Sequence, residues 1–363
     1  MSILQKLSPK SFKKLIVILS LVFIAILFFL CWLWTTYGGL GAPYECTNFA
    51  MGSFVQQTVY GKNGEAAATA AAREIGELED RISWRIEGSD IQKLNEQAGI
   101  DWIELEPETI SLLSDCLTLA QQSDGAFDPT ILPISALWDF GGENEHLPEK
   151  DQIEQFLPFV NYKDLRINEE ENTASLKYHY MGVDLGGVGK GAACDSAIAA
   201  YKQAGADCGI VSVGGSVGVY GTKPDGSLWG IAVRDPESGE DKTASMGILR
   251  ISSGFVSTSG IYERTFEQDG VSYHHLLNPK TGYPENNDLF SVTVVCENGA
   301  MSDGLATACF LLGIEKGMDL LKNYDAEGIF LTKDHEVVLT DGLIGSFEIT
   351  SEQYTFSTKG DTT

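Results

Sequence analysis

One uncharged apolar run near the N-terminus limits most strongly how this chain can fold. The run covers residues 15–34, and only Ser20 and Cys31 in it are not plainly apolar. As a helix, a run of this length would span about 30 Å, the thickness of the hydrocarbon core of a bilayer. The length and the lack of charge therefore predict a transmembrane anchor over residues 15–36.

The residues on either side of the run predict its orientation. Four lysines and no acidic residue precede it, whereas Trp32, Trp34 and Tyr37 lie where an aromatic belt would be. By the positive-inside rule, the N-terminal end stays in the cytoplasm and the rest of the chain lies outside. We therefore expect a single-pass protein of the cell membrane whose larger part is extracytoplasmic.

Two other fates of this segment are alternatives to an uncleaved anchor. A cleaved signal peptide has a shorter apolar region of about 7–15 residues and then a small-x-small site. Residues 39–41, Gly-Leu-Gly, match that site only loosely, and the apolar run is too long for a typical signal peptide. Lipidation would use Cys31, but the bulky Leu30 precedes it.

The remainder of the chain is strongly acidic. The formal net charge is −26, and without the four lysines of the N-terminal segment it becomes −30. This charge argues against nucleic acid or an anionic membrane surface as a partner and favours cationic partners or metal ions. The other six cysteines form no C-x-x-C pair, so no zinc or redox motif is supported. We expect Cys116 and Cys309 to be core thiols; the sequence does not specify a disulfide.

Hydrophobic periodicity and turn signals predict a mixed α and β domain. Helices are expected over residues 65–82, 106–122, 191–203 and 303–323. Strands are expected over 47–60 with an interruption at 51–52, and over 182–185, 209–213, 228–233, 249–257, 271–277, 290–295, 328–332 and 336–340. The predicted class is α+β, with helices packed on largely antiparallel sheets.

A glycine-rich segment at residues 183–191 could bind phosphate. Glycines at a junction before a helix let the backbone approach a ligand, and the new helix offers free N–H groups. Lys190 adds a positive charge beside Gly186 and Gly187. The segment is not a P-loop, because no Gly-Lys-Ser/Thr occurs. A tight turn with a surface lysine is the alternative.

A second segment, residues 301–308, could bind a divalent cation. Asp303 and Thr307 are four residues apart, so their oxygens share one face of a helix. A carboxylate with a hydroxyl and nearby carbonyls suits Mg²⁺, which usually keeps water or substrate phosphate as further ligands. Asp303 could equally be a helix N-cap.

Two loops carry further candidates. In residues 274–284 two histidines stand between an apolar strand and an Asn-Pro turn. One of them could act as a general base or bind substrate, although a strand histidine is often structural. Residues 124–130, Asp-Gly-Ala-Phe-Asp-Pro-Thr, could hold a planar ring system, or could be a packed loop.

Together and in this order, these segments resemble the FAD:protein FMN transferase family, also called ApbE. The resemblance extends from about residue 51 to residue 349. Its most specific part runs from 259–262 through 275–282 to 302–308, and it is supported by 51–53, 89–95, 125–130, 213–215 and 223–226. It implies an ApbE-like, T-fold-like domain. The expected organisation is a cytoplasmic basic segment (1–14), the transmembrane anchor (15–36), a linker (37–46), the flavin transferase domain (47–350) and a polar tail (351–363).

The resemblance implies roles for individual residues. Mg²⁺ would be bound by side-chain oxygens of Asp303 and Thr307 and by the carbonyl of Gly187. His275 and Asp303 would be catalytic, with His275 activating the acceptor hydroxyl. The FAD site would be lined by Met51, Trp84, Ala126, Phe127, Asp128, Asp184, Lys190 and Leu277. Trp84, Ser216 and Ile261 differ from the residues usual in the family, but none is an implied metal ligand.

The implied reaction is a Mg²⁺-dependent transfer of FMN from FAD. The acceptor hydroxyl, a Thr or Ser of an extracytoplasmic protein, attacks the FMN-side phosphorus, a phosphoester forms, and AMP leaves. The alternatives are a surface flavoprotein that only binds FAD and an FAD pyrophosphatase that transfers nothing to protein.

Overall fold

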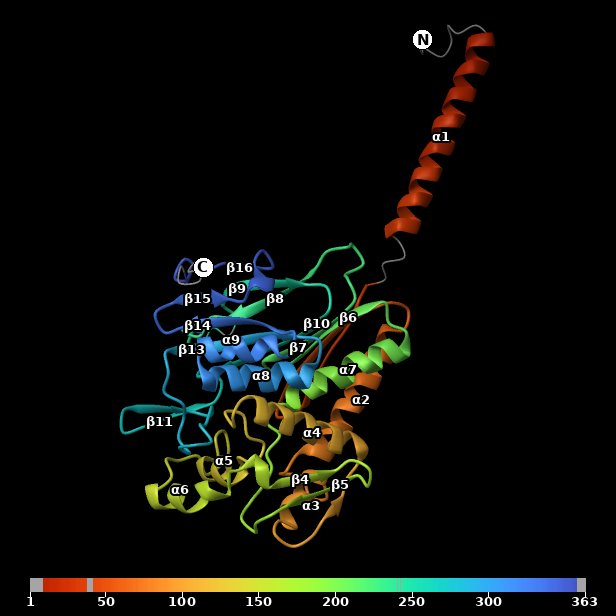
Figure 1. The fold of residues 1–363 in the computed structure, drawn as a ribbon. Helices are drawn as coiled ribbons and strands as arrows, with labels where there is room; N and C mark the ends of the chain where they lie inside the picture. Colours follow the sequence, from red (N-terminus) through yellow and green to blue (C-terminus); the bar gives the residue numbers. More distant parts are fainter. Residues whose placement is uncertain (1–8, 38–41, 240, 242, 358–363) are drawn as a thin grey trace.

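The computed structural model describes residues 9–37, 42–239, 241 and 243–357 (Figure 1). Helix α1 (Pro9–Tyr37) includes the predicted anchor, and within it side chains are described at positions 14, 18–30 and 32. The large apolar side chains described there are exposed. Among the residues so described, no helix combines the length and the hydropathy that a membrane span needs. Parts of the predicted basic segment, linker and tail (residues 1–8, 38–41 and 358–363) lie outside the described residues.

A nine-stranded sheet organises the rest of the chain. Its neighbouring strands are antiparallel except for the final pair, which is parallel. The strand order is β1 (Tyr44–Ala50), β2 (Ser53–Tyr60), β6 (Cys208–Val213), β7 (Ser216–Tyr220), β10 (Gly254–Gly260), β13 (Leu289–Cys296), β14 (Glu327–Thr332), β15 (Glu336–Leu339) and β17 (Thr355–Phe356).

The remaining strands form smaller sheets. One contains β16 (Phe347–Ile349), β9 (Ser245–Ile251) and β8 (Trp229–Arg234). Another contains β3 (Ile103–Glu104), β5 (Thr173–Leu176) and β4 (Leu165–Asn168), and a two-stranded hairpin contains β11 (Thr265–Gln268) and β12 (Val271–His274).

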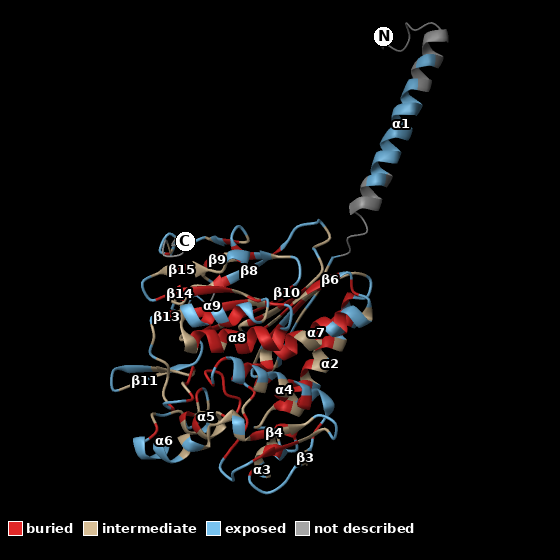
Figure 2. Ribbon diagram, viewed as in Figure 1, coloured by how far each residue is buried: buried red, intermediate tan, exposed pale blue. Residues whose placement is uncertain are grey.

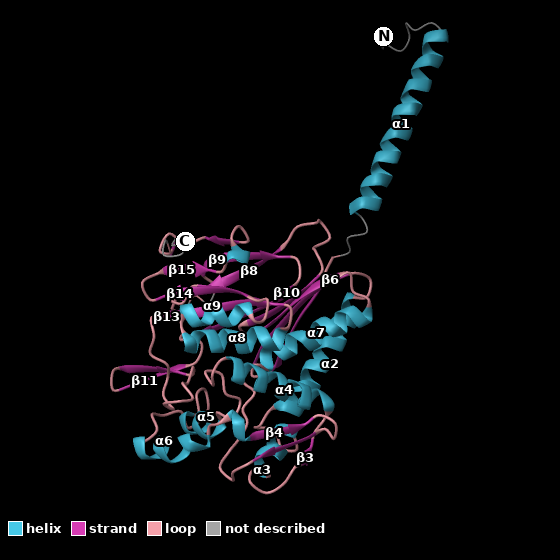
Figure 3. Cartoon of the chain, viewed as in Figure 1, coloured by secondary structure: helices cyan, strands magenta, loops and turns pink. Residues whose placement is uncertain are grey.

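Some helices pack against the large sheet, and the others lie farther from it, in the lower part of Figure 3. The helices are α2 (Gly64–Ile82), α3 (Asp90–Glu96), α4 (Pro107–Gln122), α5 (Leu132–Trp138), α6 (Lys150–Phe156), α7 (Gly189–Ala204), α8 (Gly299–Leu312) and α9 (Ile314–Lys322). Short 3₁₀ helices occur at Leu157–Phe159, Tyr162–Asp164 and Asp341–Leu343. The predicted α+β class with largely antiparallel sheets is confirmed.

The two faces of the large sheet bury different clusters, because successive side chains of a strand point to opposite faces. On β10, Phe255 packs into the cluster formed with the helices, whereas Val256 packs toward the β8–β9–β16 sheet. On β14, Phe330 belongs to the helical side and Leu331 to the other. In Figure 2 the buried residues concentrate on α8 and α7 and on the strands beside them. Helix α8 therefore lies at the centre of the core.

Several predicted elements differ in extent. The predicted helix 303–323 begins earlier, at Gly299, and is divided by Gly313, whose φ of +78° ends α8 before α9 begins. The predicted strand 249–257 is two strands in different sheets, β9 and β10. No strand forms at 182–185, where Gly182 makes only an isolated bridge with Ile131.

The predicted core thiols are confirmed. Cys116 and Cys309 are fully buried, and the six described cysteines are all free. Burial raises the pKa of both thiols, so both stay protonated and apolar in character.

Candidate active site

The N-terminal ends of α7 and α8 cross at two glycines. A Cβ atom at Gly191 would lie 1.9 Å from the carbonyl oxygen of Gly299, and one at Gly299 would lie 2.3 Å from the carbonyl oxygen of Gly191. No side chain fits at either position, because such distances are far below van der Waals contact. The crossing brings the turn that precedes α7 against the first turns of α8.

Each of these helices caps the other. The amide of Gly191 donates to Asp303 Oδ2 at 3.1 Å, and the amides of Gly299 and Ala300 donate to the carboxylate of Asp195, each at 2.8 Å. Burial raises the pKa of Asp195 to about 6. The side chain of Asn298, not that of Asp303, caps α8 by accepting from the amide of Met301. The alternative that Asp303 is the N-cap of its own helix is therefore wrong.

Side-chain oxygen atoms of Asp303, Thr307 and Ser259 lie beside this crossing. Asp303 is only 2% exposed, and its Oδ2 lies 3.5 Å from Lys190 Nζ. One turn later, Thr307 Oγ1 lies 3.0 Å from Ser259 Oγ on β10, and it would lie 4.0 Å from a Cβ at Gly187. The predicted metal-binding residues Gly187, Asp303 and Thr307 are thus brought together, with Lys190 next to them.

The side chain of Phe127 holds the glycine turn against α8. Its Cε2 atom would lie 3.2 Å from a Cβ at Gly187 and 3.9 Å from one at Gly304. Glycine at position 187 therefore leaves space for the ring, which is 5% exposed. The ring fixes where the backbone of Gly187 stands relative to Thr307.

A hairpin turn approaches the same region from the sheet. Met51, between β1 and β2, has a φ of +55°, and its Cε atom would lie 3.0 Å from a Cβ at Gly189. Next to it, Ser53 Oγ would lie 2.9 Å from a Cβ at Gly214, and Lys190 Cδ 3.4 Å from the same point. The hairpin turn that carries Met51 and Ser53 therefore lies beside Gly189 and Lys190.

A match to a known family covers this whole arrangement. The model of the ApbE family matches residues 51–330, which is more than three quarters of the chain.

The chain belongs to the ApbE family.

Similar proteins agree with this assignment. A protein of Treponema pallidum (strain Nichols) is 29% identical over 329 residues, covering 86% of this chain and 90% of its own length. A protein of Klebsiella pneumoniae (strain 342) is 30% identical and covers 82% and 92%. Both relatives are named FAD:protein FMN transferase.

Solved structures of the ApbE family share the fold. The ApbE protein of Thermotoga maritima superposes with a TM-score of 0.77 at 30% identity, covering 84% of this chain and 99% of that one. The apo form of the flavinyl transferase ApbE of Pseudomonas stutzeri gives 0.70 at 27% identity, covering 81% and 92%. The predicted ApbE-like fold is confirmed.

Asp184 and Asp128, both predicted to line the FAD site, accept hydrogen bonds from other groups of the protein. Asp184 accepts from the hydroxyl of Ser135 at 2.8 Å and from the amide of Gly186 at 2.9 Å. Asp128, 7% exposed, accepts from the amide and hydroxyl of Thr130 and from the amide of Tyr162. Burial raises the pKa of Asp128. Its carboxylate fastens the 124–130 loop, a role that the sequence did not reveal.

The expected ring-binding residues occupy two environments. One face of Trp84 carries the guanidinium of Arg85, 4.1 Å from the ring centroid, and Arg85 also pairs with Asp139 at 3.2 Å. The side chain of Leu277, 7% exposed, packs in a separate cluster with Trp138. Ala126 is buried beside Phe127. Only one face of the Trp84 ring is therefore covered by this cation.

The two neighbouring histidines at positions 274 and 275 are held differently. His274 Nε2 lies 3.0 Å from the carbonyl oxygen of Glu285, and His274 Nδ1 accepts from the amide of Leu276 at 3.3 Å. This pair of contacts needs the neutral ring, with its proton on Nε2. The Nδ1 atom of His275 is buried and has no hydrogen-bond partner among the described residues. Of these two histidines, His275 is thus the one whose Nδ1 atom has no hydrogen-bond partner within the described ranges.

Acid should destabilise the protein through His274. Burial lowers the pKa of His274 to about 4, so the unfolded chain takes up this proton first as the pH falls below about 6.5. The stability associated with the neutral ring is therefore present above pH 6.5 and is lost as the pH falls toward 4. Between pH 6 and 5, we expect the unfolding free energy of His274→Gln to decrease less steeply than that of the wild type. The two slopes should differ by about 1.4 kcal/mol per pH unit.

Chemical unfolding at several pH values measures this slope. The exposed His146 provides the control: His146→Gln should keep the slope of the wild type. Equal slopes for His274→Gln and the wild type would contradict the expectation.

Some residues of the site were missed by sequence reasoning. Ser259 contacts Thr307, and Arg85 covers Trp84. Asp195 caps α8 from a position 104 residues earlier in the chain. Ser259 belongs to a segment that carries the family resemblance, and this resemblance could have identified it as a residue of the site. No local pattern marks Asp195, since its partners come from another part of the chain.

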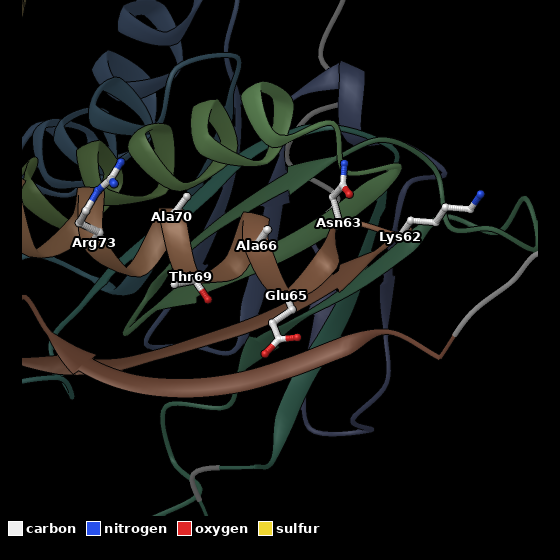
Figure 4. Close-up of a pocket in the computed structure, with 7 residues that line it drawn as sticks. All are labelled: Lys62, Asn63, Glu65, Ala66, Thr69, Ala70 and Arg73. Carbon is white, nitrogen blue, oxygen red and sulfur yellow. The ribbon is translucent and has the colours of Figure 1, made fainter.

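A surface hollow elsewhere does not involve these residues. Figure 4 shows it along α2, lined by Lys62, Asn63, Glu65, Ala66, Thr69, Ala70 and Arg73. None of these residues was predicted to belong to the site, and the hollow is open to solvent. It plays no part in the arrangement around Asp303.

Proposed function

We propose that this chain is an FAD:protein FMN transferase that attaches FMN through a phosphoester to a Thr or Ser of an acceptor protein. The observation that carries the proposal is the grouping of Gly187, Asp303 and Thr307 beside Lys190 in a chain of the ApbE family. Relatives with 29% and 30% identity are named for this activity.

The residues present fit Mg²⁺. Among the described residues, no group of three or more His, Cys, Asp or Glu could hold a metal, so softer multi-ligand sites do not compete. The buried carboxylate of Asp303, the hydroxyl of Thr307 and the carbonyl of Gly187 are hard oxygen donors, which Mg²⁺ prefers. When bound there, Mg²⁺ would neutralise charge on the phosphate oxygens of the substrate.

Positive groups of the chain itself would bind the diphosphate of FAD. Lys190 Nζ lies 3.5 Å from Asp303, so a phosphate bound near Asp303 would also be within reach of this ammonium group. The N-terminal end of α7 points its amide dipoles toward the same place. These groups would hold the phosphorus in line with the incoming hydroxyl.

In the proposed reaction, the acceptor oxygen forms a bond to the FMN-side phosphorus. The bond from that phosphorus to the bridging oxygen breaks, and AMP leaves with this oxygen. The hydroxyl proton passes to the imidazole ring of His275. Burial and the charges of Arg264 and Lys190 lower the pKa of His275 to about 3, so the ring is neutral and able to accept a proton. A bound diphosphate would offset those charges and raise this pKa.

Replacing His275 with alanine should slow transfer by about 10²- to 10⁴-fold, the usual contribution of a positioned general base. The affinity for FAD should change only a few-fold, since the ring acts on the acceptor proton. Single-turnover AMP release and FAD titration measure the two quantities, and His146→Ala is the control. Equal loss of FAD affinity and of transfer would instead assign His275 to substrate binding.

We also propose that α1 anchors the transferase domain, residues 47–350, outside the cell membrane. The apolar side chains at residues 18–30 are exposed, and lysines without acidic residues precede them. Exposed apolar area on this scale is stabilised by a bilayer. The acceptor would then be extracytoplasmic. Protease added to intact cells or spheroplasts should digest the domain; complete protection would contradict this orientation.

The transferase proposal is tested with the full-length protein in detergent. FAD, Mg²⁺ and membrane proteins from cells lacking this chain are incubated together, and AMP release and covalent flavin fluorescence are measured. Both signals, each abolished by chelation, are expected. Stable FAD binding without AMP would replace the proposal with a flavin carrier, and AMP without labelled protein would replace it with a pyrophosphatase.

A further inference from the structure

The β11–β12 hairpin places an arginine next to His275. Thr265 pairs with His274, and beyond this pair the amide of His275 donates to the carbonyl oxygen of Arg264 at 3.2 Å. Residues opposite each other on antiparallel strands project to the same face. Arg264 and His275 therefore extend from the same face of the hairpin.

This face is packed against the rest of the protein. Phe266 and Tyr273, two residues along each strand, share the face and stack on each other with centroids 5.4 Å apart. Both rings also contact Trp138 of α5, at 6.1 and 5.5 Å. The aromatic contacts fix the hairpin, so the position of Arg264 follows from packed rings and not from a free loop.

The guanidinium of Arg264 is left available. Its Cδ atom would lie 3.9 Å from a Cβ at Gly141, so the aliphatic part runs past that glycine, and the residue is exposed. Arg81, Arg85, Arg234 and Arg250 each make an ion pair. Within the part of the chain that the structure describes, Arg264 has no ion pair, although the net charge of the protein is −26. A cation without a carboxylate in so acidic a protein suits an anionic ligand.

We propose that Arg264 binds a phosphate of the FAD diphosphate, as a second cationic side chain beside Lys190. Both residues act on the same ring, since the positive charges of Arg264 and Lys190 each lower the pKa of His275. A planar guanidinium can donate two parallel hydrogen bonds to one phosphate, which an ammonium cannot. This inference rests on the proposed transferase function and adds a substrate contact to it.

The test measures binding by full-length variants, without turnover. Arg264→Gln should weaken FAD binding by about 10- to 100-fold, the range for loss of hydrogen bonds to a charged group. Arg264→Lys, which keeps the charge and the stem, should weaken it less. Competition with AMP and with FMN shows which phosphate Arg264 binds. If Arg264 binds the phosphate on the AMP side, AMP should bind Arg264→Gln no more tightly than adenosine does. If Arg264 binds the phosphate on the FMN side, FMN should bind this variant no more tightly than riboflavin does. Arg250→Gln, on β9, is the matched control and should bind FAD as the wild type does.

The outcomes separate this inference from the proposed function. If Arg264→Gln binds FAD within two-fold of the wild type, or if riboflavin and adenosine are weakened as much as the phosphorylated ligands, the inference fails and Arg264 only packs. Wild-type transfer would still stand in that case. If the wild-type protein binds no FAD, both proposals fail. Misfolding of Arg264→Gln is detected by its unfolding curve, and Arg264→Lys then decides.

Discussion

Replacing Asp303 with asparagine should lower Mg²⁺-dependent FMN transfer by about 10³-fold and leave the fold intact. The loss corresponds to about 4 kcal/mol of transition-state stabilisation, which is within the range for a metal-bound phosphoryl transfer. Asparagine has nearly the same shape and can still accept the hydrogen bond from Gly191, so the crossing of α7 and α8 should persist. What is removed is the negative charge that would bind the cation.

AMP release at saturating FAD over a Mg²⁺ titration measures this effect, with circular dichroism as the check on folding. Asp90→Asn is the matched control. Asp90 is also a buried carboxylate, 7% exposed, that accepts a backbone amide, from Glu106, but it lies on α3. That variant should lose stability and keep transfer. Wild-type Mg²⁺-dependent activity in Asp303→Asn would remove Asp303 from the metal site.

Gly191→Ala should destabilise the protein by about 3 kcal/mol or more. The new methyl group would stand 1.9 Å from the carbonyl oxygen of Gly299 and 2.9 Å from Asp303 Cβ, and backbone cannot move aside cheaply. The helices would have to separate, which also displaces Asp303 from Gly187. Both the free energy of unfolding and transfer should therefore decrease.

Gly76→Ala is the control for this substitution, because Gly76 is a helical glycine in α2. Nothing lies within 4 Å of a Cβ there. Alanine favours a helix over glycine by about 0.5–1 kcal/mol, so this variant should be slightly more stable and fully active. Urea unfolding of both variants measures the contrast. Similar stabilities for the two would show that the helices do not meet as closely as described.

The parts of the site that the sequence predicted are those encoded locally. Asp303 and Thr307 share a helical face because they are four residues apart, and Gly187 precedes a helix in a run of glycines. The contact between those two segments is not local. Periodicity does not indicate that a Cβ at Gly191 would meet Gly299, nor that Ser259 of β10 lies beside Thr307. Only the family resemblance joined these segments beforehand.

The errors in the fold prediction have similar physical causes. The stretch 249–257 reads as one strand, but the turn before Gly254, whose φ is +113°, sends β10 into the large sheet. Gly313 interrupts a pattern that is otherwise helical on both sides. In each case tertiary packing or one backbone dihedral angle determined where an element ends, which the hydrophobic pattern alone does not indicate.

The mutual capping of α7 and α8 also determines when the site can appear during folding. The hydrogen bond from Gly191 to Asp303 joins residues 112 positions apart, and the bonds from Gly299 and Ala300 to Asp195 join residues about as far apart. Closing loops of this length lowers the conformational entropy of the chain, whereas contacts within a single helix close only short loops. A chain that emerges N-terminus first can form α2, α4 and α7 before residue 299 exists, but α7 then lacks its acceptor for Gly191. The grouping of Gly187, Asp303 and Thr307 can thus form only late in folding, and a chain that ends before α8 lacks two of its three residues.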